Sequence, residues 1–476
     1  MTYIPFGPFQ PDKPSRLNDG VLSVASGAFP MPDGYRPCGQ FVAETTALPA
    51  APRGGATFVS TSGVASIIAG TQTKLYRAAG TGFSEIGSGY SLQGGMRWRF
   101  AQFGDLAIAT NSADAPVKIN LADSSVAVLG GSPPKLESIG VVKDFLVGTC
   151  PDGRINEIQW SALNNAESWT VGTGQADYNE FPDGGRVNGI LSGEFGVILQ
   201  RNAVRVMNYV GGNIIFSIDV VSTNIGCVSP HTVAQAGRLG FFIDDNGPAM
   251  WTGSDVQLIG DEEWSRAFMA GYDVNDWPEC STAIDRQIGV VLWAMPDKIW
   301  GYNWRLNRAF TLPYVSPIIF SGVSKGISLD EQDSDVGALD DNLDGVGLLS
   351  FDDPSFKGGD PRLFVFSNTY ELGTFSGSPM AATFTGTDLE LIAGRRANVR
   401  FVRPDIDCDV LTVVLKAKQR LVDSYGTATS TEYTASGDVP VRASGRYIQP
   451  TFSIPAGEIW TFAKGAEYVA GVGGGR

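Results

Sequence analysis

The sequence is nearly without histidine and carries few charges for its length. His231 is the only histidine in 476 residues, and Asp, Glu, Lys and Arg make up 18% of the chain. Catalytic triads and imidazole acid–base chemistry would therefore depend on one residue. The chain also lacks Gly-x-Gly-x-x-Gly, a Walker loop, Gly-x-Ser-x-Gly and His-Glu-x-x-His. We interpret His231 as structural, and we predict no enzymatic activity, no catalytic residue and no cofactor.

Cysteines and long apolar runs are also scarce. The five cysteines are odd in number, widely spaced and never in a Cys-x-x-Cys pattern (Cys38, Cys150, Cys227, Cys280, Cys408). This is typical of core residues in a reducing compartment rather than of a disulfide framework or zinc site. No apolar run reaches the roughly 18 residues of a membrane span, and residues 1–30 lack the regions of a signal peptide. We expect a soluble protein made in a cytoplasm, without membrane insertion.

Positive charge is in deficit. The chain has 35 basic and 50 acidic residues, a net charge of −15 and a sequence pI near 4.6. Tight wrapping of nucleic acid needs clustered Lys and Arg, so the composition argues against it. The composition is compatible with a protein whose acidic surface lines a passage for DNA, because negative side chains repel the phosphate backbone and prevent binding.

What the chain does contain is a repeat of short apolar segments joined by tight polar turns. The clearest unit is 230–260, where residues 231–236, 239–243, 248–252 and 256–259 read as four strands. Glycine and Asx residues at the joints suit hairpin turns. Second strands of successive units begin 39 to 50 residues apart, at Val64, Leu106, Phe145, Phe195, Leu239 and Ile288. This spacing is close to the roughly 40 to 50 residues of a propeller blade.

We therefore predict an all-β protein with a β-propeller-like array of four-stranded blades. A smaller C-terminal β-sandwich or barrel-like region follows it, and the last blade is closed by a distant strand. A stacked sandwich or two barrels is the alternative fold. His231 would lie in the first strand of its unit, and the clearest helix would span residues 261–272, with acids in its first turn. The expected divisions are an extended arm at 1–55, the propeller at 56–325 plus 362–384, an acidic insertion at 326–361, and a C-terminal domain at 385–476 with a flexible glycine tail.

The insertion is strongly acidic. Between residues 330 and 360 it carries ten acids against one base, Lys357 (Asp330, Glu331, Asp333, Asp335, Asp340, Asp341, Asp344, Asp352, Asp353, Asp360). Residues 340–345 match the opening of a calcium loop, with candidate ligands Asp340, Asn342 and Asp344, but the twelfth position is Phe351 instead of an acid. The alternatives are a weak calcium site and a solvated acidic loop facing the channel or a partner.

Several segments resemble a known family. They are the paired runs at 195–199 and 204–207, residues 225–233 and 240–247, residues 369–377, and residues 444–448 with 454–460. In pattern and order, over most of residues 50–470, they resemble the tail-nozzle, or packaged-DNA stabilisation, proteins of short-tailed bacteriophages. The resemblance includes no diagnostic short motif and transfers no functional residue.

The resemblance implies a structural virion protein of the phage tail, assembled in the host cytoplasm. Such proteins form a ring, usually a homohexamer, below the portal-adaptor ring and beside tail fibres or tailspikes. The ring closes the exit channel, retains the packaged genome and permits its ejection, with double-stranded DNA passing through without sequence-specific binding. Two alternatives stay open: another receptor-binding or fibre-attachment virion protein, and a carbohydrate-active propeller enzyme. The second would need only acidic and tyrosine residues, but the repeated Ser-x-Asp-x-Gly-x-Thr-Trp turn is missing.

Overall fold

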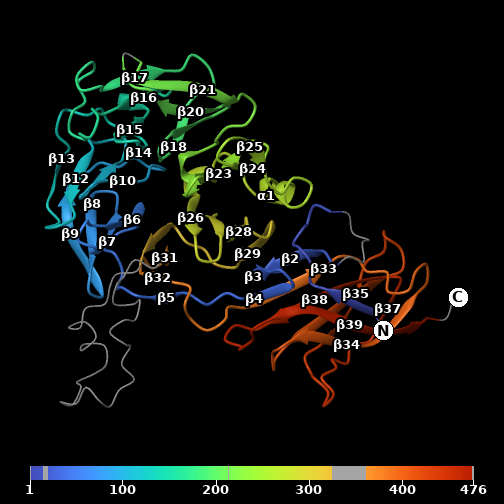
Figure 1. The fold of residues 1–476 in the computed structure, drawn as a ribbon. Coiled ribbons are helices and arrows are strands. Elements are labelled where there is room, and N and C mark those ends of the chain that lie inside the picture. The colour runs from blue at the N-terminus through green and yellow to red at the C-terminus, as the bar shows by residue number, and fades with distance from the viewer. Residues whose placement is uncertain (1, 14–19, 213, 324–360, 474–476) are drawn as a thin grey trace, which may run out of the picture.

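The computed structural model describes residues 2–13, 20–212, 214–323 and 361–473. The described chain is 49% strand and 4% helix. It contains seven four-stranded antiparallel blades, arranged as a ring, and a β-sandwich on one side of that ring (Figure 1). The all-β propeller-and-sandwich prediction is confirmed. Among the residues described, no helix is both long enough and apolar enough to span a bilayer.

Blades 1 to 4 follow each other along the chain, and each pairs its strands in sequence order. Their strands are β6 (Gly54–Val59), β7 (Ala65–Gly70), β8 (Lys74–Ala79) and β9 (Gly82–Ser88); β10 (Arg99–Phe103), β11 (Leu106–Thr110), β12 (Val117–Asn120) and β13 (Val126–Val128); β14 (Ile139–Val142), β15 (Phe145–Thr149), β16 (Glu157–Trp160) and β17 (Asp177–Glu180); β18 (Val187–Leu191), β19 (Gly196–Gln200), β20 (Val204–Tyr209) and β21 (Phe216–Ser222).

Blades 5 to 7 complete the ring, and the last one borrows a strand. In blade 7 the fourth strand is β5, which comes from the N-terminal part of the chain, so the predicted closure by a distant strand is confirmed. The strands are β22 (Ala234–Ala236), β23 (Leu239–Asp244), β24 (Gly247–Trp251) and β25 (Val256–Leu258); β26 (Ser281–Asp285), β27 (Val290–Ala294), β28 (Ile299–Asn303) and β29 (Arg308–Leu312); β30 (Ile319–Val323), β31 (Pro361–Phe366), β32 (Leu372–Thr374) and β5 (Val42–Ala43).

The sandwich is built from both ends of the chain. One sheet has the order β3-β4-β39-β34-β37, with β1 also paired to β39, and the other runs β2-β33-β38-β35-β36. The alternating burial of β38 and β35 places one face of this second sheet in the core. The strands are β1 (Thr2–Pro5), β2 (Leu22–Ser26), β3 (Ala28–Met31), β4 (Gly34–Pro37), β33 (Ala382–Gly386), β34 (Ala397–Ile406), β35 (Thr412–Lys418), β36 (Gly426–Ser430), β37 (Ala443–Gly445), β38 (Tyr447–Ile454) and β39 (Ala463–Val472).

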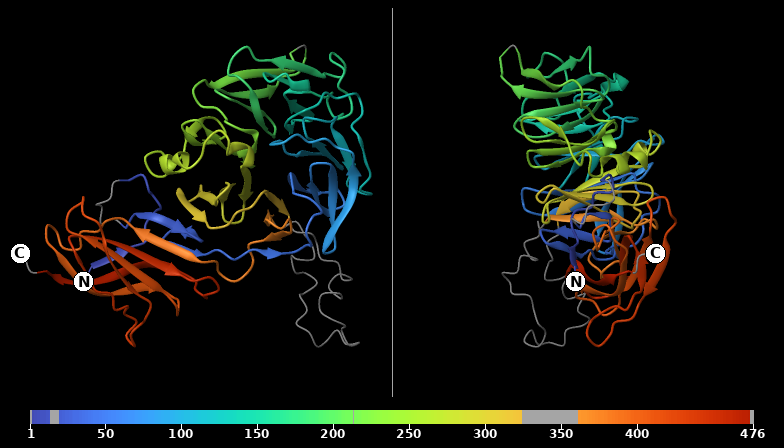
Figure 2. Two further views of the ribbon diagram at one scale, coloured as in Figure 1. Left: turned by 180° about the vertical axis from the view of Figure 1, so that it is seen from behind. Right: turned by 90° about the vertical axis from the view of Figure 1, so that its right-hand side faces the viewer.

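The propeller and the sandwich are joined through hydrogen bonds. The edge strand β29 of blade 6 pairs in parallel with β2, which makes one nine-stranded sheet across both parts. At the crossing, the Gly27 N–H donates to the Thr311 carbonyl at 2.9 Å. Nearby, the Arg308 guanidinium donates to the carbonyl oxygens of Met31 and Pro32, at 2.6 and 3.1 Å. Figure 2 shows the sandwich beside the ring from two further sides.

The buried apolar clusters lie at the interfaces between neighbouring blades. Six of the seven clusters in the described residues each join two neighbouring blades around the ring. The seventh fills the interface between blades 5 and 6, with Phe241 and Trp293, and continues into the sandwich at Phe384 and Phe452. Each blade therefore buries its faces against its neighbours, as a stacked repeat must.

Several local predictions are wrong. The described residues of the expected arm at 1–55 do not form an extended arm, because β1 to β4 lie in the sandwich sheets and β5 closes blade 7. β33 starts at Ala382, inside the range 362–384 expected for the propeller, but it pairs with β2 and β38 in the sandwich. We expected the flexible glycine tail to begin at Gly471, but Gly471 is paired with Asn398 and lies in β39.

The expected helix and the histidine strand also differ from the structure. The helix α1 spans only Ser265–Ala270, since Glu262 has φ 57 and a left-handed residue interrupts helical geometry. His231 lies in a 3-10 helix, η2 (Pro230–Thr232), because Pro230 stands at its first turn and the Ser229 hydroxyl accepts the His231 N–H at 3.3 Å. Two further 3-10 helices are η1 (Pro151–Gly153) and η3 (Trp277–Glu279).

Candidate functional site in the propeller channel

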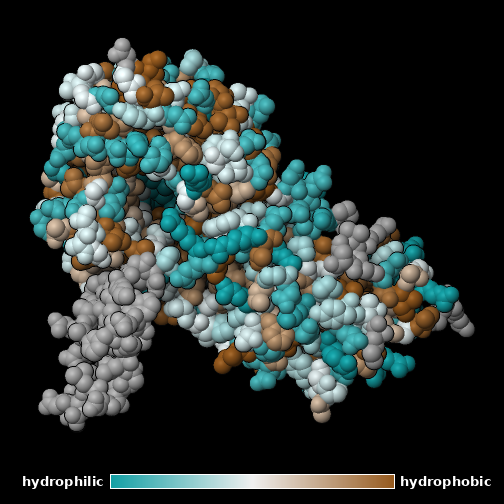
Figure 3. All heavy atoms as spheres, in the orientation of Figure 1, coloured by the Kyte–Doolittle hydropathy of each residue, from teal (hydrophilic) through white to brown (hydrophobic). Residues whose placement is uncertain are grey.

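The first strand of each blade faces the axis of the ring. These inner strands are direct neighbours from β22 through β26, β30, β6, β10 and β14 to β18. The space-filling view shows a recess in the middle of the ring with hydrophilic residues at its rim (Figure 3). The channel is therefore the place where side chains from distant parts of the sequence meet.

A cavity lies where several inner strands begin. We call it the channel cavity, and it encloses about 370 Å³ when the open solvent at its mouth is counted. It is mostly polar and is formed by blades 1, 2, 6 and 7 together with η2. Its lining residues are Gly54, Gly55, Arg97, Trp98, Arg99, His231, Cys280, Ser281, Thr282, Ile318, Ile319 and Phe320.

Two arginines enter this cavity from the start of β10. Side chains two residues apart in an extended chain point to the same side, so Arg97 and Arg99 face the cavity together. Trp98 between them points into the core of blades 1 and 2, where its ring lies 4.9 Å from that of Tyr90. In the local sequence Arg97-Trp98-Arg99, the buried tryptophan therefore fixes the backbone that directs both arginine side chains into the cavity.

Arg97 is almost fully buried, with 7% of its surface exposed. Its Nη1 donates to the Pro317 carbonyl at 3.1 Å, and its Nη2 donates to the carbonyls of Glu279 and Pro278 at 2.9 and 3.3 Å. Burial lowers the pKa of Arg97 to about 10, and the positive charge of Arg99 adds to the decrease. Carbonyl oxygens solvate this guanidinium but do not neutralise it.

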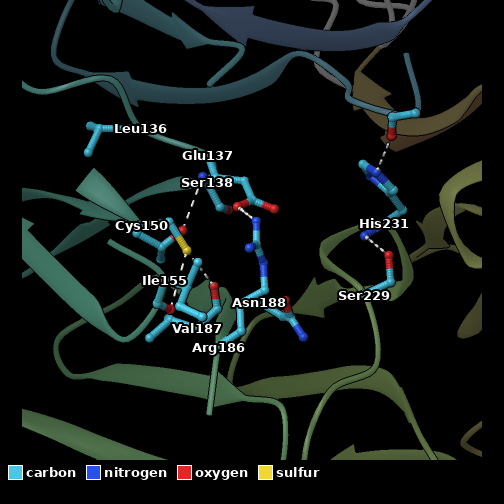
Figure 4. A network of polar contacts seen from close by, with 12 residues as sticks. Leu136, Glu137, Ser138, Cys150, Ile155, Arg186, Val187, Asn188, Ser229 and His231 are labelled. Carbon is cyan, nitrogen blue, oxygen red and sulfur yellow. Dashed lines mark hydrogen bonds and ion pairs between the residues drawn. The ribbon is translucent and has the colours of Figure 1, made fainter. Parts of the chain in front are cut away.

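Arg99 donates from Nη2 to His231 Nδ1 at 2.6 Å. On the other side of the ring, His231 Nε2 lies 3.0 Å from the Gly95 carbonyl and donates to it. Figure 4 shows His231 beside Ser229, whose hydroxyl accepts the backbone N–H of His231. A ring that accepts at one nitrogen and donates at the other is neutral. Burial and the charges of Arg99 and Arg97 lower the pKa of His231 well below 6.5, in agreement with this tautomer.

The nearest buried acid is already paired. Glu137 forms an ion pair with Arg186, and Figure 4 shows this pair beside Cys150. The Cys150 thiol donates to the Val187 carbonyl at 3.2 Å, and burial raises its pKa to about 12. Within the described parts of the chain, neither Arg97 nor Arg99 has a carboxylate at ion-pair distance.

The cysteines have the environment expected of core residues. All five are free; Cys38, Cys150, Cys227 and Cys280 are buried, and Cys408 is half-buried. Burial raises the pKa of both Cys227 and Cys280 to about 11. A thiol is nucleophilic only as the thiolate, so these groups are inert at neutral pH.

The acidic loop lies outside the described residues, which leave out 324–360. The calcium candidates Asp340, Asn342 and Asp344 remain predictions, and so do the channel or partner-facing acids (Asp330, Glu331, Asp333, Asp335, Asp340, Asp341, Asp344, Asp352, Asp353). Among the residues that are described, no group of three or more His, Cys, Asp or Glu side chains is placed to hold a metal.

Sequence reasoning missed Arg97 and Arg99. The available signal was the alternation of two arginines with one aromatic residue at 97–99, where β10 begins, which places both charges on one side of an extended chain. It did not identify His231 as their partner, because 132 positions separate it from Arg99.

Comparisons with known proteins give structural similarity only. No protein-family model and no curated protein matches the chain. One similar structure is the β-propeller domain of Cps50 (Swd1) from Myceliophteria thermophila, at 7% identity and a TM-score of 0.39, over 59% of this chain and 92% of that one. The WD40 repeats of RRP9 give 12% identity and 0.37, over 60% and 89%.

A third similar structure is the extracellular domain of a hybrid two-component system from B. thetaiotaomicron. It has 8% identity and a TM-score of 0.43, and the match covers 84% of this chain and 47% of that one. We assign the propeller fold from the strand pairing of this chain itself.

Proposed function

We propose that this chain is a structural subunit of the tail of a short-tailed bacteriophage, where copies form a ring that closes the DNA exit channel. The ring retains the packaged genome and lets it pass at ejection. It binds the portal-adaptor ring on one side and tail fibres or tailspikes on the other. The family resemblance of the segments between residues 195 and 247, of 369–377, and of 444–448 with 454–460 supports this proposal, and the fold supports the mechanical role.

We base the mechanical role on the nine-stranded sheet that crosses from blade 6 into the sandwich. A ring subunit under the pressure of packaged DNA must keep its parts in fixed relation. Shared main-chain hydrogen bonds and one apolar core across the junction resist hinge motion better than a linker does. The net charge of −15 per chain supports a channel wall that repels the DNA phosphates.

Sedimentation and negative-stain imaging of the purified chain, alone and with a portal-adaptor ring, test this role. We expect closed rings, with six copies as the leading stoichiometry, that stack coaxially on the adaptor. A gel-shift assay with double-stranded DNA at low salt should show no retained complex. An elongated trimer would favour a fibre-attachment protein instead, and salt-sensitive DNA binding would contradict a non-adhesive channel.

A further inference from the structure

The channel cavity holds more positive charge than the protein compensates. Arg97 and Arg99 both line it, and neither has a carboxylate partner within the described ranges. Of the two nearby acids, Glu137 forms its ion pair with Arg186, and the exposed Glu279 bonds to Arg97 through its main-chain carbonyl. Their carboxylates attract the two arginines only from beyond ion-pair distance. Arg97 is buried and Arg99 is half-buried, and charges in such positions are normally paired, because an uncompensated buried charge destabilises the fold.

Arg99 has free donor capacity in the cavity. A guanidinium carries five N–H groups, and Arg99 donates one of them to His231. The imidazole cannot neutralise the arginine, because it is itself neutral and held as an acceptor by its bond to Gly95. The hydroxyls of the lining residues Ser281 and Thr282 already donate to the carbonyls of Ile319 and His231, at 3.0 and 2.8 Å.

We propose that the channel cavity binds a small inorganic oxyanion of the phosphate or sulfate type, with the Arg99 guanidinium as its main ligand. The planar fork of arginine matches two oxygens of such an anion. Arg97 supplies a second positive charge from a position fixed by three carbonyl oxygens. A bound anion would link blades 1, 2, 6 and 7 and η2 at the mouth of the propeller's own central channel. This channel lies within one subunit, whereas the proposed DNA exit channel lies between subunits. The site is independent of the proposed phage role.

Calorimetric titration with inorganic phosphate, at ionic strength held constant with chloride, tests this on the full-length chain. We expect saturable one-site binding and a rise in Tm that grows with phosphate concentration, since a ligand of the native state stabilises it. Arg99→Gln should weaken binding by about tenfold or more, the scale of a lost charge-assisted pair. Arg395→Gln removes the same charge from an exposed position in the sandwich and should leave the affinity unchanged.

Arg99→Lys keeps the charge but loses the fork, so we expect intermediate affinity with an unchanged far-UV spectrum. This variant decides the question if Arg99→Gln fails to fold. Titration with sulfate distinguishes a general oxyanion site from one selective for phosphate. Absence of saturable heat in the unmodified protein, or equal affinity in Arg99→Lys, Arg99→Gln and the unmodified protein, would overturn the proposal.

Discussion

The propeller and the sandwich solve the same packing problem in different ways. Around the ring, separate apolar clusters join each blade to the next, so most contacts are made between neighbours in sequence. The sandwich has a single large core that includes parts of blades 5 and 6, and its strands come from opposite ends of the chain, as in the pairing of Thr2 with Tyr468. A substitution that disrupts packing should therefore destabilise only the two adjoining blades in the ring, whereas in the sandwich it should destabilise the whole shared core.

Matched aromatic deletions give the largest expected effect. Phe384 and Phe145 are both fully buried, the first in the shared core and the second between blades 3 and 4. Each change to alanine should cost about 3 to 5 kcal/mol. By hydrogen exchange, Phe384→Ala should deprotect the sandwich together with blades 5 and 6, whereas Phe145→Ala should deprotect only blades 3 and 4. If the loss of protection extended equally far from the two sites, the propeller and the sandwich would not differ in how they transmit a packing defect.

A buried ion pair in the sandwich gives the next effect. Lys418 Nζ lies 2.8 Å from the Asp388 carboxylate, and the two side chains are 9% and 2% exposed. Lys418→Met leaves Asp388 buried, with the Tyr425 hydroxyl as its remaining partner among the described residues, so we expect a loss of about 3 kcal/mol in denaturant unfolding. The exposed pair Lys74–Glu85 of blade 1 is the control, and Lys74→Met should show no measurable loss. A tolerant Lys418→Met would show that water reaches this core.

Gly27 tests the joint between the two parts. It has φ 78 and lies directly after β2, where a Cβ would meet the Ala381 carbonyl oxygen at 1.9 Å. Gly394 has a similar φ of 68 but open space around it. Both alanine variants carry the backbone strain, so the difference measures the clash. We expect Gly27→Ala to cost about 2 kcal/mol more than Gly394→Ala in urea unfolding. Equal losses of stability in the two variants would mean that the backbone around Gly27 shifts to accommodate the added Cβ without cost.

The same contrast explains what the sequence could predict. Second strands such as β15, β19 and β27 are buried on both faces, so they appear as continuous apolar runs and were located within two residues. The six second-strand starts do not include one for blade 7, because residues 324–360 separate β30 from β31 and the last strand of that blade is β5. Local pattern carries no information on such pairings, nor on β1 and β39 meeting in one sheet.

The candidate site was hidden for a related reason. Arg97 and Arg99 are close in sequence, but His231, Cys280 and Ile318 reach the cavity from three other parts of the ring. Only closure of the ring brings them together. The neutral state of His231 also follows from this closure, since it depends on the two arginines and on the Gly95 carbonyl.

The pH dependence of the channel gives the smallest expected effect. His231 titrates near 6.5 when unfolded, and in the fold burial and the charges of Arg99 and Arg97 depress its pKa well below that value. Below pH 6.5 the unfolded chain therefore binds a proton that the native chain does not. Linkage makes the free energy of unfolding fall as the pH falls, by up to about 1.4 kcal/mol per pH unit from this group, until the folded pKa is reached.

His231→Gln isolates that contribution. Glutamine can donate to the Gly95 carbonyl and accept from Arg99 but does not titrate, so the pH profile of the variant should be flatter between pH 6.5 and 5. Carboxylates elsewhere titrate equally in both proteins, so the difference between the two profiles reports the histidine. Hydrogen exchange should place the acid-induced loosening at η2 and the start of β10, with the sandwich unaffected. Parallel pH profiles of the variant and the unmodified protein would mean that His231 is protonated in the folded protein at the same pH as in the unfolded chain. The charges of the two arginines would then not depress its pKa.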